Sequence, residues 1–298
     1  MNTLFLYVTA VVIWGSTWLA IKFQLGAVPP EVSVAYRFAL AGIMLVAWCR
    51  IRGLTLRYSF GQHFAMALQG ALLFGLNYVC IYLAEARLSS GLVAVIFSLI
   101  TFFNIFGTRV FFGKPVKRLT LLSAAFGVAG VALVFLPEIR QAAGGRQAGI
   151  GALFAVAGTA SACLGNLMAA RNQKAGMPVV QLNTFGMLYG AVFVASYAWL
   201  AGRPFVFDAS LPYLASLGYL AFFGSILAFG AYLTLVGRIG ADRAGYTGAA
   251  IPIVALALSA LFEGLQLHVT TVAGIALCLT GNVLVLRRPP TSTSAKRS

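Results

Sequence analysis

Ten apolar runs follow one another along almost the whole sequence, and each is about long enough to cross a membrane. A helix needs roughly 20 apolar residues to span the hydrocarbon core of a bilayer, where backbone polar groups have no water to bind and must be satisfied within the chain. The runs cover residues 4–24, 32–49, 64–85, 90–112, 119–136, 149–170, 180–201, 212–237, 243–264 and 271–286. We therefore predict an all-α, polytopic membrane protein with ten transmembrane helices.

The charge balance supports a lipid bilayer as the main partner. Only 9% of the residues are charged, whereas soluble domains carry about 25%. The 21 Lys and Arg against 6 Asp and Glu give a net charge of +15, which in a soluble chain would suggest a nucleic-acid partner. Here the basic residues lie in short connections between apolar runs and form no basic helix face, so we expect no nucleic-acid partner.

The basic residues also predict the orientation of the chain, because cytoplasmic connections of membrane proteins are enriched in Lys and Arg. Fourteen of the 21 fall on one side if the N-terminus is cytoplasmic, four fall on the other, and three lie in or at the ends of spans. The chain is thus expected to be a multi-pass protein of the cell (inner) membrane with both termini cytoplasmic. Residues 287–298 read as a basic, disordered cytoplasmic tail.

The two halves of the chain resemble each other at an offset of 151 residues. Arg87 then matches Arg238, and Gly130 matches Gly281. Each half holds five spans, an odd number, so the second half must enter the membrane from the opposite side. We predict two inverted five-helix repeats, 1–140 and 149–286, a construction typical of secondary transporters with a central site.

The sequence lacks the motifs of several classes of enzyme and metal site. It has no HExxH metalloprotease motif, no GxxxxGK[ST] phosphate loop and no CxxC pair, and its six acidic residues are isolated from one another. We therefore expect no enzyme activity, no catalytic residue, no metal site and no cofactor. A carrier of a small-molecule substrate fits the pattern better.

The candidate substrate site is built from polar and aromatic stripes within the spans. Trp14, Trp18 and Lys22 recur every four residues and would share one helix face. Close helix packing is the alternative for the neighbouring Gly15, and an interhelical hydrogen bond is the alternative for any single Asn or Tyr. The candidate residues are Trp14, Thr17, Trp18, Asn77, Tyr78, Tyr82, Ser98, Thr101, Asn166, Tyr232, Tyr246 and Pro252.

Charged residues within spans are costly and are therefore functional candidates. We predict that Lys22, Arg37, Glu85 and Glu263, which lie toward the outer ends of their helices, form an outer gate in one state of the protein. Snorkelling to the interface is the alternative for the two cations. The midplane holds no carboxylate, which argues against a direct proton relay but leaves proton coupling through Glu85 or Glu263 open.

The sequence resembles the EamA-type ten-helix exporters of the drug/metabolite transporter superfamily. The resemblance rests on Trp14-Gly15-Ser16-Thr17-Trp18, on Pro29-Pro30, on Arg37-Phe38, on Leu88-Ser89-Ser90-Gly91, on Ile251-Pro252-Ile253 and on Leu261-Phe262-Glu263. It covers nearly the whole chain. It implies export of amino acids, related metabolites or drugs through a basket-like cavity lined by helices one, three, four, six, eight and nine. The aromatic stripes make the chain similar to the aromatic amino-acid exporters of that family.

The first half departs from the family pattern in two places. Thr101 stands where the family often has a proline comparable to Pro252, and Phe112-Gly113-Lys114 stands where an acid comparable to Glu263 is common. These departures argue against a kink in helix four and against a second gate acid.

Three functions remain open from the sequence. The first is a secondary transporter that exports small organic solutes, preferably hydrophobic or aromatic amino acids, by alternating access through a largely apolar cavity, as a monomer or weak dimer. The second is an antiporter of phosphorylated metabolites or nucleotide sugars, which would require a Lys or Arg at the cavity centre. The third is a structural membrane protein without transport activity.

Overall fold

The computed structural model describes residues 2–113, 116, 118–134, 136, 142–239, 246–265 and 268–286. The described residues form helices and no strand. The helices of the first half are α1 (Thr3–Lys22), α2 (Pro30–Ile51), α3 (Phe60–Gly70), η1 (Ala71–Leu76), α4 (Asn77–Glu85), α5 (Ser90–Phe97), α6 (Ile100–Phe112) and α7 (Arg118–Val134). Those of the second half are α9 (Ala142–Lys174), α10 (Val179–Leu200), α11 (Leu211–Tyr219), η2 (Leu220–Leu227), α12 (Ala228–Ile239), α14 (Tyr246–Phe262) and α15 (Val269–Leu286).

The ten predicted spans agree with these elements. Seven helical stretches in the described part of the chain are long and apolar enough to cross a membrane. Three shorter apolar helices, Leu121–Val134, Ala250–Phe262 and Val269–Gly281, occupy the remaining predicted windows. The fold is thus that of an all-α polytopic membrane protein. The predicted tail, 287–298, lies outside the described residues.

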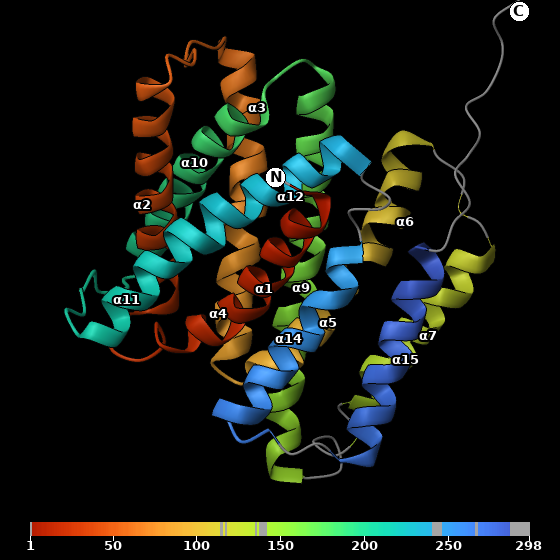
Figure 1. Cartoon of the computed structure of the whole chain (residues 1–298). Coiled ribbons are helices and arrows are strands. Elements are labelled where there is room, and N and C mark those ends of the chain that lie inside the picture. The colour runs from red at the N-terminus through yellow and green to blue at the C-terminus, as the bar shows by residue number, and fades with distance from the viewer. Residues whose placement is uncertain are drawn as a thin grey trace, which may run out of the picture.

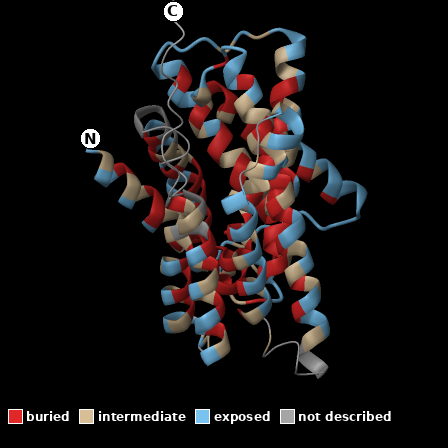
Figure 2. Ribbon diagram, turned by 90° about the vertical axis from the view of Figure 1, so that its right-hand side faces the viewer, coloured by how far each residue is buried: buried red, intermediate tan, exposed pale blue. Residues whose placement is uncertain are grey.

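Burial follows the pattern expected of a protein surrounded by lipid. Large apolar side chains such as Val110, Leu153 and Val192 are exposed on the outside of the bundle, while Arg37 and Glu85 are buried inside it. Figure 2 shows buried residues on the inward helix faces and exposed residues on the outward faces. Apolar surface of this kind is stable against acyl chains rather than against water.

The helices pair across the two halves of the chain. Packed pairs are α2 with α10, α7 with α15, α1 with α14 and α12, and α9 with α4, α5 and α6. In Figure 1, α7 and α15 lie side by side at one edge of the bundle, and α2 and α10 lie together toward the opposite edge. The interior is therefore formed where helices of both halves meet.

Small residues allow α7 and α15 to approach closely. A Cβ at Gly130 would lie 2.6 Å from the backbone nitrogen of Cys278 and 2.6 Å from the carbonyl oxygen of Gly274. A Cβ at Gly281 would lie 2.5 Å from the carbonyl oxygen of Ser123. The pairing order reverses along the two helices, so they run antiparallel with backbones in contact, as small-residue interfaces in membranes permit.

Three spans are interrupted near their middles. The third and eighth contain π-helical turns, η1 and η2, which often mark functional sites. The fourth span breaks between α5 and α6, so the expectation of an unkinked helix four is wrong. The Ser98 hydroxyl donates to the Val95 carbonyl oxygen at 2.7 Å, and the Leu99 N–H bonds the carbonyl of Ile96, three residues back, at 3.0 Å. A serine that competes for a backbone carbonyl disturbs the helix without a proline.

The α7–α15 contact gives a test of the fold. We expect Gly130→Ala to lower the free energy of unfolding by about 1–3 kcal/mol, because the new methyl group would meet backbone atoms that cannot move away alone. Thermal unfolding of the purified, detergent-solubilised protein measures this. The matched control is Gly218→Ala in α11, where a Cβ meets nothing within 4 Å. Equal melting temperatures for the two variants would contradict the close packing.

Candidate functional site

A cluster of polar groups joins helix ends at one end of the bundle; we call Lys22, Glu85, Ser90 and Glu263 the Lys22 cluster. The Lys22 ammonium donates to the backbone carbonyls of Glu85 and Leu88 and forms an ion pair with the Glu263 carboxylate, Nζ to Oε1, at 3.6 Å. The Ser90 N–H donates to Glu263 Oε2 at 3.0 Å, and the Ser90 hydroxyl donates to the same oxygen. The cluster thereby connects α1, α4, α5 and α14.

Helix geometry explains why Glu263 is stable in this position. Ser90 begins α5, whose first N–H groups have no partner within the helix. The Glu263 carboxylate accepts one of these bonds and lies at the positive end of the helix dipole. Its side chain is 14% exposed and that of Lys22 is 27% exposed, so the ion pair is only partly screened by solvent.

Glu85 is the buried acid of the cluster. Its exposed fraction is 0%, and neither carboxylate oxygen has a hydrogen-bond partner. Lys22, Glu263 and Arg37 are the charges that act on it. Lys22 lies next to Glu85 but bonds only the Glu85 backbone oxygen and pairs with the other acid. The Lys22 ammonium thus interacts electrostatically with two carboxylates but forms an ion pair only with that of Glu263.

Arg37 lies outside the Lys22 cluster and is 1% exposed. Its Nε donates to the Ser225 hydroxyl of η2 at 3.4 Å, and its guanidinium lies 4.6 Å from the centre of the Tyr78 ring and 5.1 Å from that of Phe38. Nη1 has no hydrogen-bond partner. The side chain is buried, so it does not extend to the membrane surface.

A chain of aromatic contacts crosses the bundle next to Arg37. Trp14 contacts Phe229 with ring centres 5.1 Å apart, and Phe229 contacts Phe74 at 5.6 Å. Phe74 contacts Phe38 at 5.3 Å, and Phe38 contacts Tyr78 at 4.7 Å. These five rings, which we call the aromatic chain, connect α1, α12, η1, α2 and α4.

Helix one holds its predicted residues against both halves. Trp14 Nε1 donates to the Gly224 carbonyl oxygen of η2 at 3.2 Å, and the Trp14 ring lies 5.2 Å from the ring of Tyr232. Thr17 is buried, with its hydroxyl bonded to the Trp14 carbonyl at 2.7 Å. The Trp18 ring packs on Phe97 of α5 at 5.3 Å, and Trp18 Nε1 has no hydrogen-bond partner.

Helix three contributes Asn77 and Tyr82 in addition to Tyr78. The Asn77 amide nitrogen donates to the Leu73 carbonyl at 3.1 Å, while Asn77 Oδ1 has no hydrogen-bond partner. The Tyr82 hydroxyl donates to Gln24 Oε1 at 2.6 Å, and Tyr82 is fully buried. Both side chains point into the protein rather than toward lipid.

The remaining predicted residues lie along α5, α6, α9 and α14. Ser98 lies at the break in helix four, and Pro252 is buried inside α14. Thr101 faces Gly248, since a Cβ there would lie 3.6 Å from its Oγ1. The Asn166 amide nitrogen bonds Asn104 Oδ1 at 3.5 Å. Tyr246 begins α14, and its side chain lies outside the described part of the structure.

Sequence reasoning missed three residues that take part in these contacts. Ser90 lies within the Leu88-Ser89-Ser90-Gly91 motif, so its start-of-helix position was the available signal. Gln24 follows Lys22 by two residues and is 1% exposed, which no apolar pattern indicates. Ser225 reaches Arg37 because η2 is π-helical, and its hydroxyl bonds the Leu220 carbonyl five residues back at 2.9 Å.

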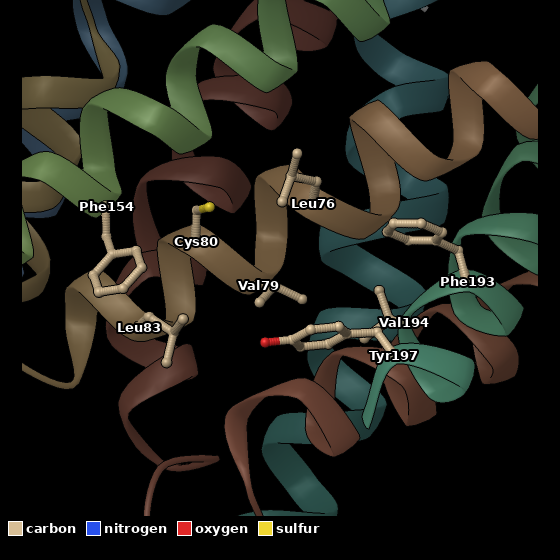
Figure 3. A pocket seen from close by; sticks show the side chains of 8 residues that line it. All are labelled: Leu76, Val79, Cys80, Leu83, Phe154, Phe193, Val194 and Tyr197. Carbon is tan, nitrogen blue, oxygen red and sulfur yellow. The ribbon is translucent and has the colours of Figure 1, made fainter. Parts of the chain in front are cut away.

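An apolar hollow of 210 Å³ lies apart from these residues, between η1 and α4 on one side and α9 and α10 on the other (Figure 3). It is lined by Leu76, Val79, Cys80, Leu83, Phe154, Phe193, Val194 and Tyr197. Leu76, Phe193 and Tyr197 are exposed on the outside of the bundle. The hollow therefore opens toward the surrounding membrane and contains none of the predicted site residues.

Comparison with known proteins agrees with this architecture. The sequence matches the EamA-like transporter family over residues 1–136 and again over residues 149–287. It is 22% identical to protein PagO of Salmonella typhimurium over 95% of both chains, and 26% identical to the uncharacterized transporter YvbV of Bacillus subtilis over 95% of this chain and 91% of that one.

Two further comparisons concern a partial relative and the fold. The chain is 29% identical to the uncharacterized inner membrane transporter YedA of Escherichia coli over 61% of its length and 54% of that of YedA. A solved crystal structure superposes with a TM-score of 0.68 over 95% of this chain and 96% of the other, at 19% identity. At that identity the superposition supports the fold alone.

The ion pair of the Lys22 cluster predicts coupled stability effects. In a double-mutant cycle with Lys22→Met and Glu263→Gln, we expect a coupling energy of about 0.5–2 kcal/mol, because the pair is partly buried and hydrogen-bonded. Chemical or thermal unfolding of the four proteins in detergent measures it. Additive single-variant effects would show that the two side chains do not interact.

Proposed function

The chain belongs to the EamA-like transporter family, and from this we propose that it is a secondary transporter that exports small organic solutes by alternating access, hydrophobic or aromatic amino acids first among them. The observation that carries the cargo assignment is the aromatic chain from Trp14 to Tyr78, which ends at the buried Arg37 guanidinium. Apolar and aromatic walls with a few polar groups are typical of small-molecule sites.

The proposed duplication provides the two arrangements that alternating access requires. In the 151-residue register, Ser123, Gly127 and Gly130 correspond to Gly274, Cys278 and Gly281. The α7–α15 contact is reciprocal in this register: Gly130 faces Gly274 and Cys278, and Gly281 faces Ser123 and Gly127. Reciprocal contacts are the mark of a two-fold axis, and an antiparallel pair requires that axis to lie in the membrane plane. This supports residues 1–140 and 149–286 as inverted repeats.

We place the Lys22 cluster at the outer face of the cell (inner) membrane, with both termini in the cytoplasm. The distribution of Lys and Arg among the connections supports this orientation. The cluster then closes the outer side in this conformation, because it bonds the ends of α1 and α14 to the start of α5. Opening requires Lys22 and Glu263 to separate. Glu85 is the nearby acid with which the Lys22 ammonium can then form an ion pair instead.

Transport itself is tested by flux in proteoliposomes. We expect labelled phenylalanine, tyrosine, tryptophan or leucine to be exchanged across the membrane, with and without a pH gradient to show whether protons are coupled. Nucleotide sugars and sugar phosphates serve as the competing class, since their phosphates require cations at the centre of the protein. Flux of the phosphorylated solutes alone would favour the antiporter, and flux of no solute would favour a structural role.

The gate is tested by locking it. In a Lys22→Cys/Glu263→Cys variant, a short bis-methanethiosulfonate reagent should join α1 to α14 and stop flux, and a reductant should restore it. The native cysteines Cys49, Cys80, Cys163 and Cys278 are all buried, so little background reaction is expected. Each single-cysteine variant, treated in the same way, is the control. A cross-linked protein that transports at the untreated rate would rule out a gate at this position.

A further inference from the structure

We infer that Arg37 is the anion-binding residue of the transport site and receives the carboxylate of the cargo, rather than serving as part of the outer gate. The assignment rests on the proposed function and narrows its cargo to organic carboxylates with an apolar or aromatic body. Three features carry it: a guanidinium that is held on most sides, an uncommitted terminal nitrogen, and aromatic walls beside it.

The guanidinium is positioned before any ligand binds. Ser225 accepts from Nε, and Tyr78 and Phe38 flank the group at 4.6 and 5.1 Å. Gly224 makes room, because a Cβ there would lie 3.3 Å from Nη2 and 2.8 Å from Cγ2 of Thr17. Groups whose orientation is already held lose little freedom on binding, so their hydrogen bonds contribute more to affinity.

The Arg37 Nη1 group, which has no hydrogen-bond partner, is suited to bind an anion. An arginine stays protonated in proteins, and a buried cation without a partner is strongly unfavourable. Nη1 is buried without a hydrogen bond. Glu85 is the acid whose charge interacts with Arg37, but among the described residues no carboxylate lies within 4.0 Å of the guanidinium, and the ion pairs found are Lys22 with Glu263 and Arg203 with Glu31. A ligand carboxylate matches the fork of N–H groups that a guanidinium presents.

The surroundings define the rest of the ligand. The aromatic chain begins at the Tyr78 and Phe38 rings that flank Arg37 and continues to Trp14. Trp14 also bonds the backbone of Gly224, whose Cβ position is next to the Arg37 guanidinium. An apolar side chain attached to the carboxylate would thus lie among rings. A phosphate ester carries up to two charges, and Lys22, the other cation near this region, is committed to Glu263.

The test compares ligands that share one apolar body and differ in whether they carry a carboxylate, an ammonium group or both. Binding to the purified wild-type protein is measured by thermal shift and by isothermal titration with L-phenylalanine, 3-phenylpropionate and 2-phenylethylamine, and with L-leucine, 4-methylpentanoate and isoamylamine. We expect both carboxylate-bearing members of each set to bind at least about tenfold more tightly than the amine. The affinity of each amino acid is also compared with that of the corresponding acid without an amino group. Tighter binding of the amino acid would identify amino acids, rather than other carboxylates, as the preferred ligands.

Variants assign the preference to this residue. Arg37→Gln should weaken carboxylate binding about 10- to 100-fold, the loss typical of a charge-assisted bond, while amine binding changes by less than about threefold. Arg37→Lys keeps the charge but loses the planar fork, so it should recover part of the affinity. Arg203→Gln is the control. The Arg203 side chain is half exposed and already pairs with Glu31 at 3.6 Å, so its loss should leave all affinities unchanged.

Two results would overturn the assignment. One is a wild-type protein that binds the amines as tightly as the acids. The other is an Arg37→Gln protein that folds, as judged by its melting temperature, and retains the carboxylate preference. Should Arg37→Gln fail to fold, Arg37→Lys takes its place, and carboxylate affinity in that variant equal to that of the wild-type protein would overturn the assignment. Flux of amino acids by a protein that shows no carboxylate preference in binding would reject the role of Arg37 alone. Carboxylate binding without flux of any solute would leave anion binding by Arg37 in place and reject the transport function.

Discussion

Polar groups inside a lipid bilayer have no water to bind, so each must find its partner within the protein or bear a large cost. This constraint shapes the whole molecule. It makes the backbone helical throughout the described spans, turns apolar side chains outward, and concentrates the rare charged side chains where helices of the two halves meet. Lys22 shows the effect clearly, because it is bonded to two backbone carbonyls at the end of α4 and to a carboxylate at the end of α14.

The same constraint gives the helix interruptions a purpose. A helix that is regular along its length offers no free backbone groups, whereas η2 turns the Gly224 carbonyl toward Trp14 and brings the Ser225 hydroxyl to Arg37. The Ser98 hydroxyl bonds a carbonyl where helix four breaks. Irregular backbone at membrane depth is tolerated where protein surrounds it. These places are also where spans can change shape without losing all their hydrogen bonds.

Sequence patterns predict the fold well because hydrophobic length and charge asymmetry are properties of whole segments. All ten windows correspond to helices or to interrupted helices of the described chain. They predict the site only in part. The four-residue spacing of Trp14, Trp18 and Lys22 indicated one helix face, but neither the aromatic chain nor the bond between Arg37 and Ser225 follows from spacing. Both depend on how segments far apart in the sequence cross: Arg37 and Ser225 are 188 residues apart, and Trp14 contacts Phe229 of the other half. The break at Ser98 depends on a local hydroxyl bond and involves no proline.

The proposed repeat also shows where the two halves have diverged in chemistry. In the 151-residue register, Phe112 corresponds to Glu263. Phe112 is the last residue of α6 and Glu263 directly follows α14. Each is close to a lysine: Glu263 pairs with Lys22, while the Lys174 ammonium lies 4.7 Å from the centre of the Phe112 ring. One contact is an ion pair that separates only if its carboxylate finds water, a proton or another cation. The other is a cation–π contact, which involves no acid and is weaker at exposed sites. The two contacts would therefore respond differently to pH and to a charged solute, because only the ion pair contains a carboxylate.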